Sequence, residues 1–287
     1  MPIRRCRPLL GTFVEIEATA RTESLALEGV EAAFGAVSRV QRLMSFHDEA
    51  SDVARLNANA AERDVEIDPW TFEVLRAAVD LHARSRGAVD VSVAPLLQRW
   101  GFLPAFGDET RPAAVDQSAI ELRPGHRVRF RRAVRIDLGG IAKGFAVDRA
   151  IDALRGAGVA SASVNAGGDL RVFGVASTVH VRHPRMPGRM LPLLRIDDGA
   201  VATSASYFSK RRCNGRWVSP LVDPQRGRSC ATTSSVTVHA SSCLAADALT
   251  KVLAILGARS APILRAHSAR GYLVTRAGVA VAGESAA

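Results

Sequence analysis

Lysine is nearly absent from this chain, although the chain is strongly basic. Only three of its 38 basic residues are lysine, at positions 143, 210 and 251, and the formal net charge is +10. Such an arginine bias is typical of a GC-rich genome, so the charge alone is weak support for a nucleic-acid surface. The rarity of lysine makes each one informative, and two of the three fall inside motifs described below.

Aromatic residues and cysteines are also few. Aromatics make up 5% of the chain, so aliphatic side chains must form most of the core. The four cysteines, at positions 6, 213, 230 and 243, include no C-x-x-C pair, which gives zinc and dithiol redox sites little support. Cys213 and Cys230 could pair in an oxidising compartment, but we expect free thiols.

The chain has no long apolar run. Pro8, Glu15 and Glu17 interrupt the apolar stretch near the N-terminus, where a signal peptide needs a longer core. Arginines precede Cys6 in place of a lipobox, and no window approaches a membrane span. These absences predict a cytoplasmic protein without a membrane span.

The expected elements indicate an α+β fold. With 287 residues, 47% of them hydrophobic, the chain suits one large domain or two subdomains sharing a cleft. Residues 104–126 are polar and predict a surface excursion. Segments with helical periodicity and segments with strand-like alternation of apolar and polar residues are interspersed, without the strict βαβ order of a doubly wound sheet. We expect helices over 24–45, 68–86, 145–155 and 245–256, and a short helix with Ser51 as its N-cap. We expect a strand or hairpin edge over 127–138, strands over 12–18, 161–165, 169–173, 178–182, 193–202 and 234–240, and a hairpin over 271–283.

The stretch IDLGGIAKGFAVD (136–148) places two glycines and a lysine between a strand and a helix. A helix N-terminus attracts anions, and the glycines allow a close backbone approach. The order matches neither a P-loop nor a dinucleotide fingerprint, because Lys143 precedes Gly144 and the glycines read G-G-x-x-x-G. By spacing alone, a phosphate cradle and a plain turn are equally open. A salt-bridge cluster of Lys143 with Asp137 and Asp148 is a third alternative.

Nine blocks along the chain, in a fixed order, resemble the ApbE-type FAD:protein FMN transferases. They are LLGT (9–12), MSFHDEASDVARLN (44–57), GAVDVSVAPLLQRWGF (87–102), IDLGGIAKGFAVD (136–148), VNAGGDLRVFG (164–174), VATSASY (201–207), VDPQRG (222–227), SVTVHA (235–240) and ADALTKVLAILG (246–257). The resemblance implies mixed, mostly antiparallel sheets with flanking helices around a central FAD cleft. It covers residues 1–287 as a single domain, or as two subdomains sharing that cleft.

The resemblance also implies an activity. The FMN half of FAD is joined by a phosphodiester to a threonine of an acceptor flavoprotein, AMP leaves, and Mg²⁺ assists. Carried over by position, the FAD contacts are Leu10, Phe46, Ala88, Val89, Asp90, Asp137, Lys143 and Leu221. The metal ligands are Gly140 through its backbone oxygen, Asp247, Thr250 and Lys251.

Several of these residues have structural alternatives. Asp90 could cap a turn, and Asp247 could be a carboxylate that the dipole of a helix N-terminus favours. Leu10 and Phe46 could belong to the core. Asp247 and Thr250 are three residues apart, which places both on one side of a helix.

Three positions leave the family pattern. Pro220 stands where the family has histidine, Arg226 where it has threonine, and Lys251 where it has a second threonine. Pro220 cannot act as a base, so the catalytic base is unassigned, and His183 and His239 are the candidate substitutes. A lysine beside Asp247 would either repel Mg²⁺ or replace it electrostatically. FAD would then bind while metal-dependent transfer is altered.

Two other functions stay open. One is an FAD-binding protein or FAD pyrophosphatase without protein transfer, suggested by Pro220 and Lys251. The other, ranked far third, is a nucleic-acid-binding module based on the basic cluster over 210–228, and we expect no nucleic-acid partner. Neither the acceptor protein nor the oligomeric state is written in the sequence.

Overall fold

The computed structural model describes residues 2–104, 114–182, 188, 190–205, 209–230, 235–275 and 278–282. The chain divides into two compact units, each assembled from separated segments. Unit 1 comprises Met1–Gln41, Lys143–Ala205 and Thr233–Ala287, and unit 2 comprises Arg42–Ala142 and Ser206–Thr232. The cleft expected between two subdomains stays a prediction.

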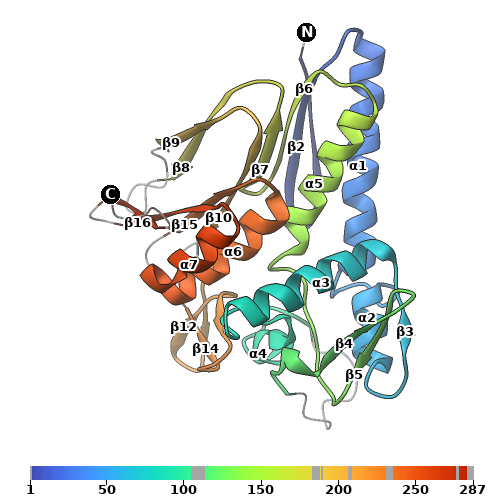
Figure 1. Ribbon diagram of the computed structural model, residues 1–287, viewed down its shortest axis with the longest axis vertical. Coiled ribbons are helices and arrows are strands. Elements are labelled where there is room, and N and C mark those ends of the chain that lie inside the picture. Colours follow the sequence, from blue (N-terminus) through green and yellow to red (C-terminus); the bar gives the residue numbers. More distant parts are fainter. Residues whose placement is uncertain are drawn as a thin grey trace. The chain divides into compact units, whose positions relative to one another are not determined.

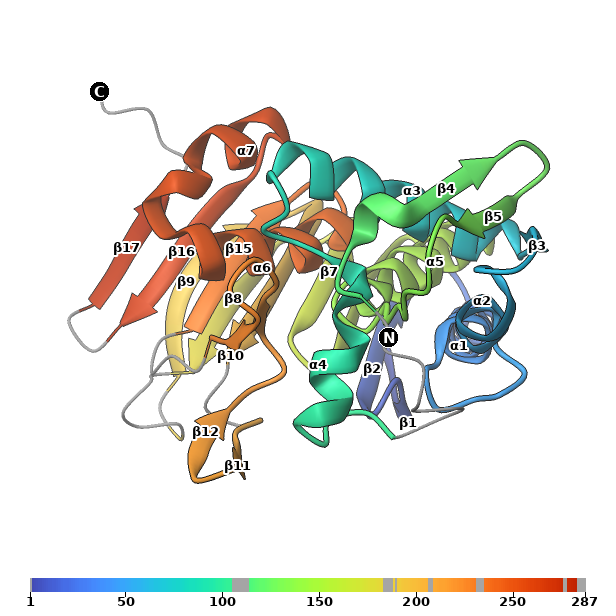
Figure 2. The same cartoon turned by 90° about the horizontal axis from the view of Figure 1, so that it is seen from below.

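Unit 1 is built on an eight-stranded sheet in which every neighbouring pair is antiparallel (Figures 1 and 2). Its order is β1 (Ile3–Leu9), β2 (Thr12–Thr19), β6 (Ser161–Ala166), β7 (Asp169–Phe173), β10 (Gly199–Ala205), β15 (Ser235–Ala240), β16 (Arg270–Thr275) and β17 (Gly278–Ala282). A two-stranded sheet joins β8 (Ser177–Arg182) to β9 (Met190–Ile196).

Local sequence explains these strands. In β2 the buried side chains are Val14, Ile16 and Ala18, which alternate with glutamates as a half-buried strand requires. The β1–β2 turn is Leu10-Gly11, and both residues have positive φ, at 56° and 68°. Two such residues fit a tight hairpin whose twist matches the strands.

The helices of unit 1 pack by their apolar faces. They are α1 (Glu23–Met44, whose last residues enter unit 2), α5 (Ala142–Gly156), α6 (Cys243–Leu256) and α7 (Ala261–Ala266), with a 3₁₀ turn η4 (Gly257–Ser260). A Cβ on Gly29 of α1 would meet Leu154 of α5 at 3.5 Å, so these two helices lie side by side (Figure 1). Helix α6 packs on β10 and β15. Ser242 caps it by accepting from the Ala245 N–H.

Unit 2 holds short elements. Its helices are α2 (Asp52–Asn59), α3 (Pro69–Arg84) and α4 (Ala94–Arg99), with 3₁₀ turns η1 (Val91–Val93) and η2 (Gln117–Ala119). A three-stranded sheet has the order β3 (Val65–Glu66), β5 (Arg127–Phe130), β4 (Ile120–Arg123). Two hairpins follow, β11 (Arg211–Cys213) with β12 (Arg216–Val218), and β13 (Val222–Asp223) with β14 (Arg228–Ser229).

The α+β class and the antiparallel pairing confirm the sequence interpretation, and three local expectations need correction. Residues 117–123 form η2 and β4, so they are not a surface excursion, and 105–113 lie outside the described residues. The strand or hairpin edge expected over 127–138 ends at Phe130, because its partner β4 has only four residues and its partner β3 only two. The strand over 193–202 is two strands, interrupted by Asp197-Asp198.

The tip of the expected C-terminal hairpin, 276–277, is outside the described residues, while its two strands pair as expected. The four cysteines are free thiols. Within the described parts of the chain, none of the helices combines the length and the apolar character that a membrane crossing requires.

Candidate functional site

Unit 1 brings together two lysines and two aspartates from three elements. Lys143 is in the first turn of α5, and Asp169 begins β7 after the turn Gly167-Gly168. Asp247 and Lys251 lie one turn apart on α6. We call Lys143, Asp169, Asp247 and Lys251 the four-charge cluster. Two of the three lysines of the chain are in it.

The cluster consists of two ion pairs with buried anions. Lys143 Nζ donates to Asp169 Oδ2 at 2.5 Å, and Lys251 Nζ donates to Asp247 Oδ1 and to the Asp247 carbonyl oxygen, the latter at 3.0 Å. The aspartate side chains are 2% and 1% exposed, whereas Lys143 is 33% and Lys251 19% exposed. The cationic side chains therefore reach the surface and the carboxylates do not.

Electrostatics couple the four groups. Burial works against the charge of Lys143, but the carboxylates of Asp247 and Asp169 raise its pKa above the ordinary lysine value. Burial also works against the Asp247 carboxylate, yet Lys251 and then Lys143 hold its pKa below the usual range. Burial and the charge of Asp247 raise the pKa of Asp169. Asp247 is therefore the firmly ionised member, with both lysines as its counter-charges.

Gly144 explains why a glycine follows Lys143. Its N–H donates to Asp247 Oδ2 at 3.1 Å. A Cβ at this position would lie 2.2 Å from the Cys243 carbonyl oxygen and 2.8 Å from the Asp247 Cβ. Only a residue without a side chain lets α5 approach α6 this closely.

A second buried carboxylate fixes the start of α6. Asp148 of α5 accepts hydrogen bonds from the N–H groups of Cys243 and Leu244, at 2.9 and 2.8 Å, and pairs with Arg171 at 2.5 Å. Burial raises the pKa of Asp148, while Arg171 and these N–H groups lower it. Lys143 therefore does belong to a salt-bridge cluster, but its ion-pair partner is Asp169, while Asp148 pairs with Arg171.

Two hydroxyl groups, from Thr250 and Ser204, lie between α6 and β10. Thr250 Oγ1 donates to the Asp247 carbonyl oxygen at 2.7 Å and lies 2.7 Å from Ser204 Oγ of β10. Thr250 is fully buried. Asp247, Thr250 and Lys251 are thus brought together as expected, but their polar atoms bond to one another.

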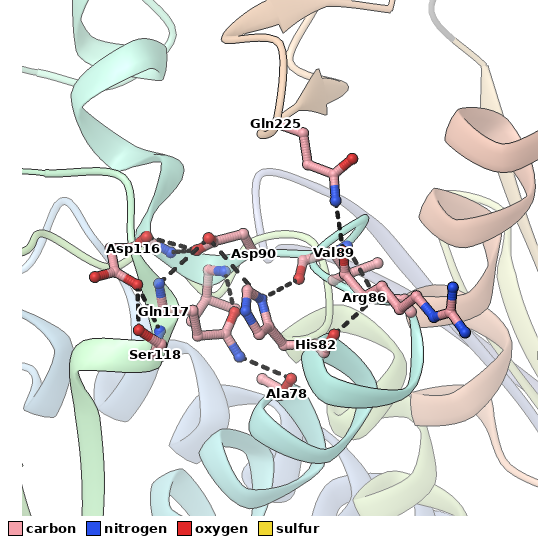
Figure 3. Close-up of polar contacts among 12 residues, drawn as sticks. Ala78, His82, Arg86, Val89, Asp90, Asp116, Gln117, Ser118 and Gln225 are labelled. Atoms are coloured by element: carbon pink, nitrogen blue, oxygen red, sulfur yellow. Dashed lines mark hydrogen bonds and ion pairs between the residues drawn. The ribbon is translucent and has the colours of Figure 1, made fainter.

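Asp90 in unit 2 has its carboxylate occupied by its own segment (Figure 3). It accepts from the Ser92 N–H at 2.7 Å, from Ser92 Oγ at 2.5 Å and from the Gln117 N–H at 3.3 Å. His82 Nδ1 bonds to the Val89 carbonyl and lies 3.9 Å from Asp90 Oδ2. The capping alternative for Asp90 describes this geometry, and the contact with the adenine end of FAD that the family resemblance implies for Asp90 stays a prediction.

Asp137 lies in the segment beside Asp90. Its N–H donates to the Val91 carbonyl at 2.8 Å. Burial raises the pKa of the Asp137 carboxyl. A hydrogen bond from the Gly139 N–H and the charge of His47 lower this pKa in part. Unit 2 therefore places Asp90 and Asp137, two of the expected FAD contacts, in neighbouring segments.

The other expected contacts are spread over both units. Leu10, in unit 1, donates its N–H to Gln41 Oε1 at 2.6 Å. Phe46 and Ala88, in unit 2, are buried among core residues at 7% and 1% exposure, while Val89 and Leu221 are partly exposed. Gly140 is exposed in unit 2, whereas the other expected metal ligands are in unit 1. That these residues surround one flavin and one metal stays a prediction.

The sequence profile of the ApbE family matches residues 10–273. The chain belongs to the ApbE family. A relative from Vibrio cholerae named FAD:protein FMN transferase is 28% identical over 248 residues, which cover 77% of this chain and 71% of the relative. One of the same name from Rhodobacter capsulatus is 30% identical over 279 residues, covering 90% of this chain and 52% of the relative.

Solved ApbE structures share the fold. The ApbE protein from Thermotoga maritima superposes with a TM-score of 0.86 at 26% identity, covering 98% of this chain and 96% of its own. The flavin transferase ApbE from Vibrio cholerae gives a TM-score of 0.80 at 25% identity, with the same coverage. This likeness confirms the expected ApbE-like fold.

Within this ApbE-family chain, the ligand set expected for Mg²⁺ does not fit the ion. Mg²⁺ demands near-octahedral oxygen coordination, in which one or two protein carboxylates are joined by water and phosphate oxygens. Here Asp247 Oδ1 and its carbonyl bond Lys251, Oδ2 bonds the Gly144 N–H, and the Thr250 hydroxyl is engaged. Among the described residues no group of three or more His, Cys, Asp or Glu could hold a metal.

The three departures from the ApbE pattern have structural consequences. Pro220 is exposed in the segment before β13. Arg226 forms part of the β13–β14 turn, where its backbone N–H and guanidinium bond Asp223 at 3.1 and 3.2 Å. Lys251 belongs to the four-charge cluster. Of the substitute bases, His183 lies outside the described residues and His239 is on β15.

Sequence reasoning missed Asp169, the partner of Lys143. A signal was present, because an acidic residue directly follows the glycine pair of the block VNAGGDLRVFG (164–174). It also missed Ser204, which lies in the block VATSASY (201–207) and bonds Thr250. Neither residue stands at a sequence spacing from α6 that would reveal the contact. The pairing of β7 with β10 in the sheet brings both residues to α6.

Proposed function

We propose that this chain transfers the FMN moiety of FAD to a threonine of an acceptor flavoprotein and releases AMP. The observation that carries the proposal is the four-charge cluster at the start of α5, in the ApbE block that contains Lys143. Family membership and the relatives named FAD:protein FMN transferase support the reaction class.

The cluster suits the charge of the reaction. FAD carries a pyrophosphate, and phosphoryl transfer depends on holding it in place and neutralising its negative charge. Lys143 and Lys251 have partly exposed side chains, and a lysine binds phosphate as a point charge. Their buried aspartate partners fix where these charges lie.

In the proposed step the acceptor threonine oxygen attacks the phosphorus of the FMN half. A new P–O bond forms, the pyrophosphate bond on the AMP side breaks, and AMP leaves with that electron pair. The threonine proton passes to the departing phosphate or to water. We assign no side-chain base to this step, because Pro220 occupies the position of the family's histidine.

The magnesium requirement that the resemblance implies is not part of the step. The oxygen atoms of Asp247 and Thr250 are engaged with Lys251, Gly144 and Ser204, so this cluster offers a metal no free ligand set. We therefore derive no role for a metal.

Covalent flavinylation of an acceptor tests the proposal. The protein, FAD and an acceptor domain already known to be flavinylated by another ApbE protein should yield a fluorescent acceptor band in a denaturing gel. The acceptor with its threonine replaced by alanine is the control and should give no band. A competent acceptor that stays unlabelled, with and without Mg²⁺, would overturn the proposal.

A second candidate is an FAD-binding protein or FAD pyrophosphatase that lacks protein transfer. Pro220 and Arg226 favour it, because both replace polar positions of the family pattern near the expected flavin contact Leu221. AMP released from FAD without an acceptor, together with an unlabelled acceptor, would select the pyrophosphatase.

A further inference from the structure

The ammonium group of Lys251 occupies the place beside Asp247 that a bound cation would need. It bonds two oxygens of the same residue, Oδ1 and the backbone carbonyl. The remaining carboxylate oxygen accepts the Gly144 N–H, and Thr250 uses the carbonyl as well. Among these atoms, every acceptor of Asp247 has a donor.

The charge of the cluster is already balanced. Two lysines face two aspartates, and each ammonium group is paired with one carboxylate. A divalent cation placed at Asp247 would add two positive charges next to an ammonium group in a poorly solvated site, where charges interact strongly. Metal binding would therefore require Lys251 to leave.

The residue type at position 251 also fits the place of a small cation. The chain uses arginine for 35 of its 38 basic positions but lysine here. A lysine ammonium is a compact point charge, whereas the planar guanidinium of arginine needs a wider, forked partner. The compact ammonium group of Lys251 can therefore take the place of a small metal ion beside the single carboxylate of Asp247.

Resting on the proposed function, we infer that Lys251 is a built-in cation that replaces the divalent metal, so that this chain binds the pyrophosphate of FAD through two ammonium groups without a metal. Lys143 supplies the second group. Both lysine side chains are partly exposed, while both carboxylates are buried. An incoming diphosphate therefore meets the cationic side of each pair.

Metal titration of the flavin-free protein tests the inference directly. Calorimetric titration of EDTA-treated, dialysed wild-type protein with MgCl₂ or MnCl₂ should show no stoichiometric uptake. Lys251→Thr removes the ammonium and leaves space and a hydroxyl beside Asp247, and it should take up one ion per chain. Wild-type protein that binds one Mg²⁺, with binding lost in Asp247→Asn, would overturn the inference.

Matched variants separate this effect from a general loss of charge. Lys210→Thr makes the same substitution at the third lysine, which lies in unit 2, and should gain no metal binding. Lys251→Met keeps the length of the side chain without offering an oxygen, and should also gain none. If Lys251→Thr fails to fold, Lys251→Ser removes the ammonium group in the same way and should take up one ion per chain, and uptake of one Mg²⁺ by the wild type would still overturn the inference.

FAD affinity provides the second measurement. Wild-type affinity, followed by quenching of flavin fluorescence, should be the same in EDTA and in Mg²⁺. Lys251→Thr should lose affinity about 10- to 100-fold in EDTA, as expected for a charged hydrogen bond, and should recover part of it with Mg²⁺. A wild-type affinity that rises strongly with Mg²⁺ would contradict the inference.

The two proposals fail separately. A wild-type protein that binds no FAD under any condition would remove the proposed function. The metal titration contains no flavin, so it would still show whether Lys251 excludes a divalent ion from Asp247.

Discussion

The backbone N–H of Gly144 and the buried carboxylate of Asp247 are joined by a 3.1 Å hydrogen bond between residues 103 positions apart. This bond sets the first turn of α5 against α6. It also brings Lys143, the neighbour of Gly144, into electrostatic contact with Asp247. The geometry of the four-charge cluster therefore depends on a side chain being absent at position 144.

Replacing Gly144 with alanine should destabilise unit 1 severely. The added Cβ would meet the Cys243 carbonyl oxygen at 2.2 Å, a backbone atom that cannot move without shifting α6. We expect a loss of about 3 kcal/mol or more in the free energy of unfolding, at the upper end for overpacking. Urea denaturation followed by circular dichroism measures it.

Gly156→Ala is the matched control on the same helix. Gly156 is exposed at the end of α5, and a Cβ there meets nothing within 4 Å. Alanine should be neutral or should stabilise by up to about 1 kcal/mol through helix propensity. Equal unfolding free energies for the two variants would show that α5 and α6 are not in close contact at Gly144.

Asp148→Asn should weaken the anchor between α5 and the start of α6. The asparagine amide cannot accept from both Cys243 and Leu244, and it leaves the largely buried Arg171 without its counter-charge. Breaking such a buried pair costs about 2–4 kcal/mol. Thermal and urea unfolding should both detect the loss.

Asp152→Asn, also on α5, makes the same chemical change at an exposed position. Its ion pair with Arg149 spans 3.0 Å, and Asp152 is 47% exposed. Such surface pairs contribute about 0–1 kcal/mol. If the Asp152 variant lost as much stability as the Asp148 variant, the buried anchor would not be the cause.

The sequence predicted much of the fold, because many elements of both units carry strong local patterns. The alternation in β2 and the periodicity of α1 follow from which side chains are buried, and Ser51 and Asp68 cap α2 and α3 as their positions indicate. Residues 193–202 show where local patterns fail, because they predict one strand where the structure has two, β9 and β10. The Asp197-Asp198 break is set by pairing with different partners, β8 and β7.

The site was harder to predict than the fold, because its contacts join distant segments. The sequence offered a salt-bridge cluster of Lys143 with Asp137 and Asp148 as one of three alternatives, because these aspartates are near in sequence. Its actual partner, Asp169, reaches it through the position of β7 in the sheet. The unusual residue Lys251 was recognisable from sequence, but only the structure shows that its ammonium group bonds both Oδ1 and the backbone carbonyl oxygen of Asp247.

Asp90 provides a test of whether a capping residue also binds ligand. Asp90→Ala removes the acceptor for Ser92 and Gln117, and should cost about 0.5–2 kcal/mol of unfolding free energy. Asp90→Asn keeps one acceptor oxygen and should cost less. If Asp90 also contacts the adenine end of FAD, the affinity for FAD should fall in Asp90→Asn beyond what its stability loss explains. Fluorescence titration at a temperature where both variants are folded separates the two effects, and unchanged affinity in both would remove Asp90 from the FAD contacts.

Stability should fall on mild acidification because of His239. Burial, and then the charge of Arg270, its partner across β15 and β16, lower the pKa of His239 below the ordinary value of 6.5. The unfolded chain therefore takes up a proton at a higher pH than the folded chain does. The contribution of His239 is fully present above pH 6.5 and is lost as the pH falls from there through the folded-state pKa. Urea unfolding between about pH 7.5 and 5 should show this decline, and His239→Gln should make it shallower. Arg270→Gln removes the second cause and leaves burial, so its profile should lie between the other two; a decline as steep in His239→Gln as in the wild type would assign it to other groups.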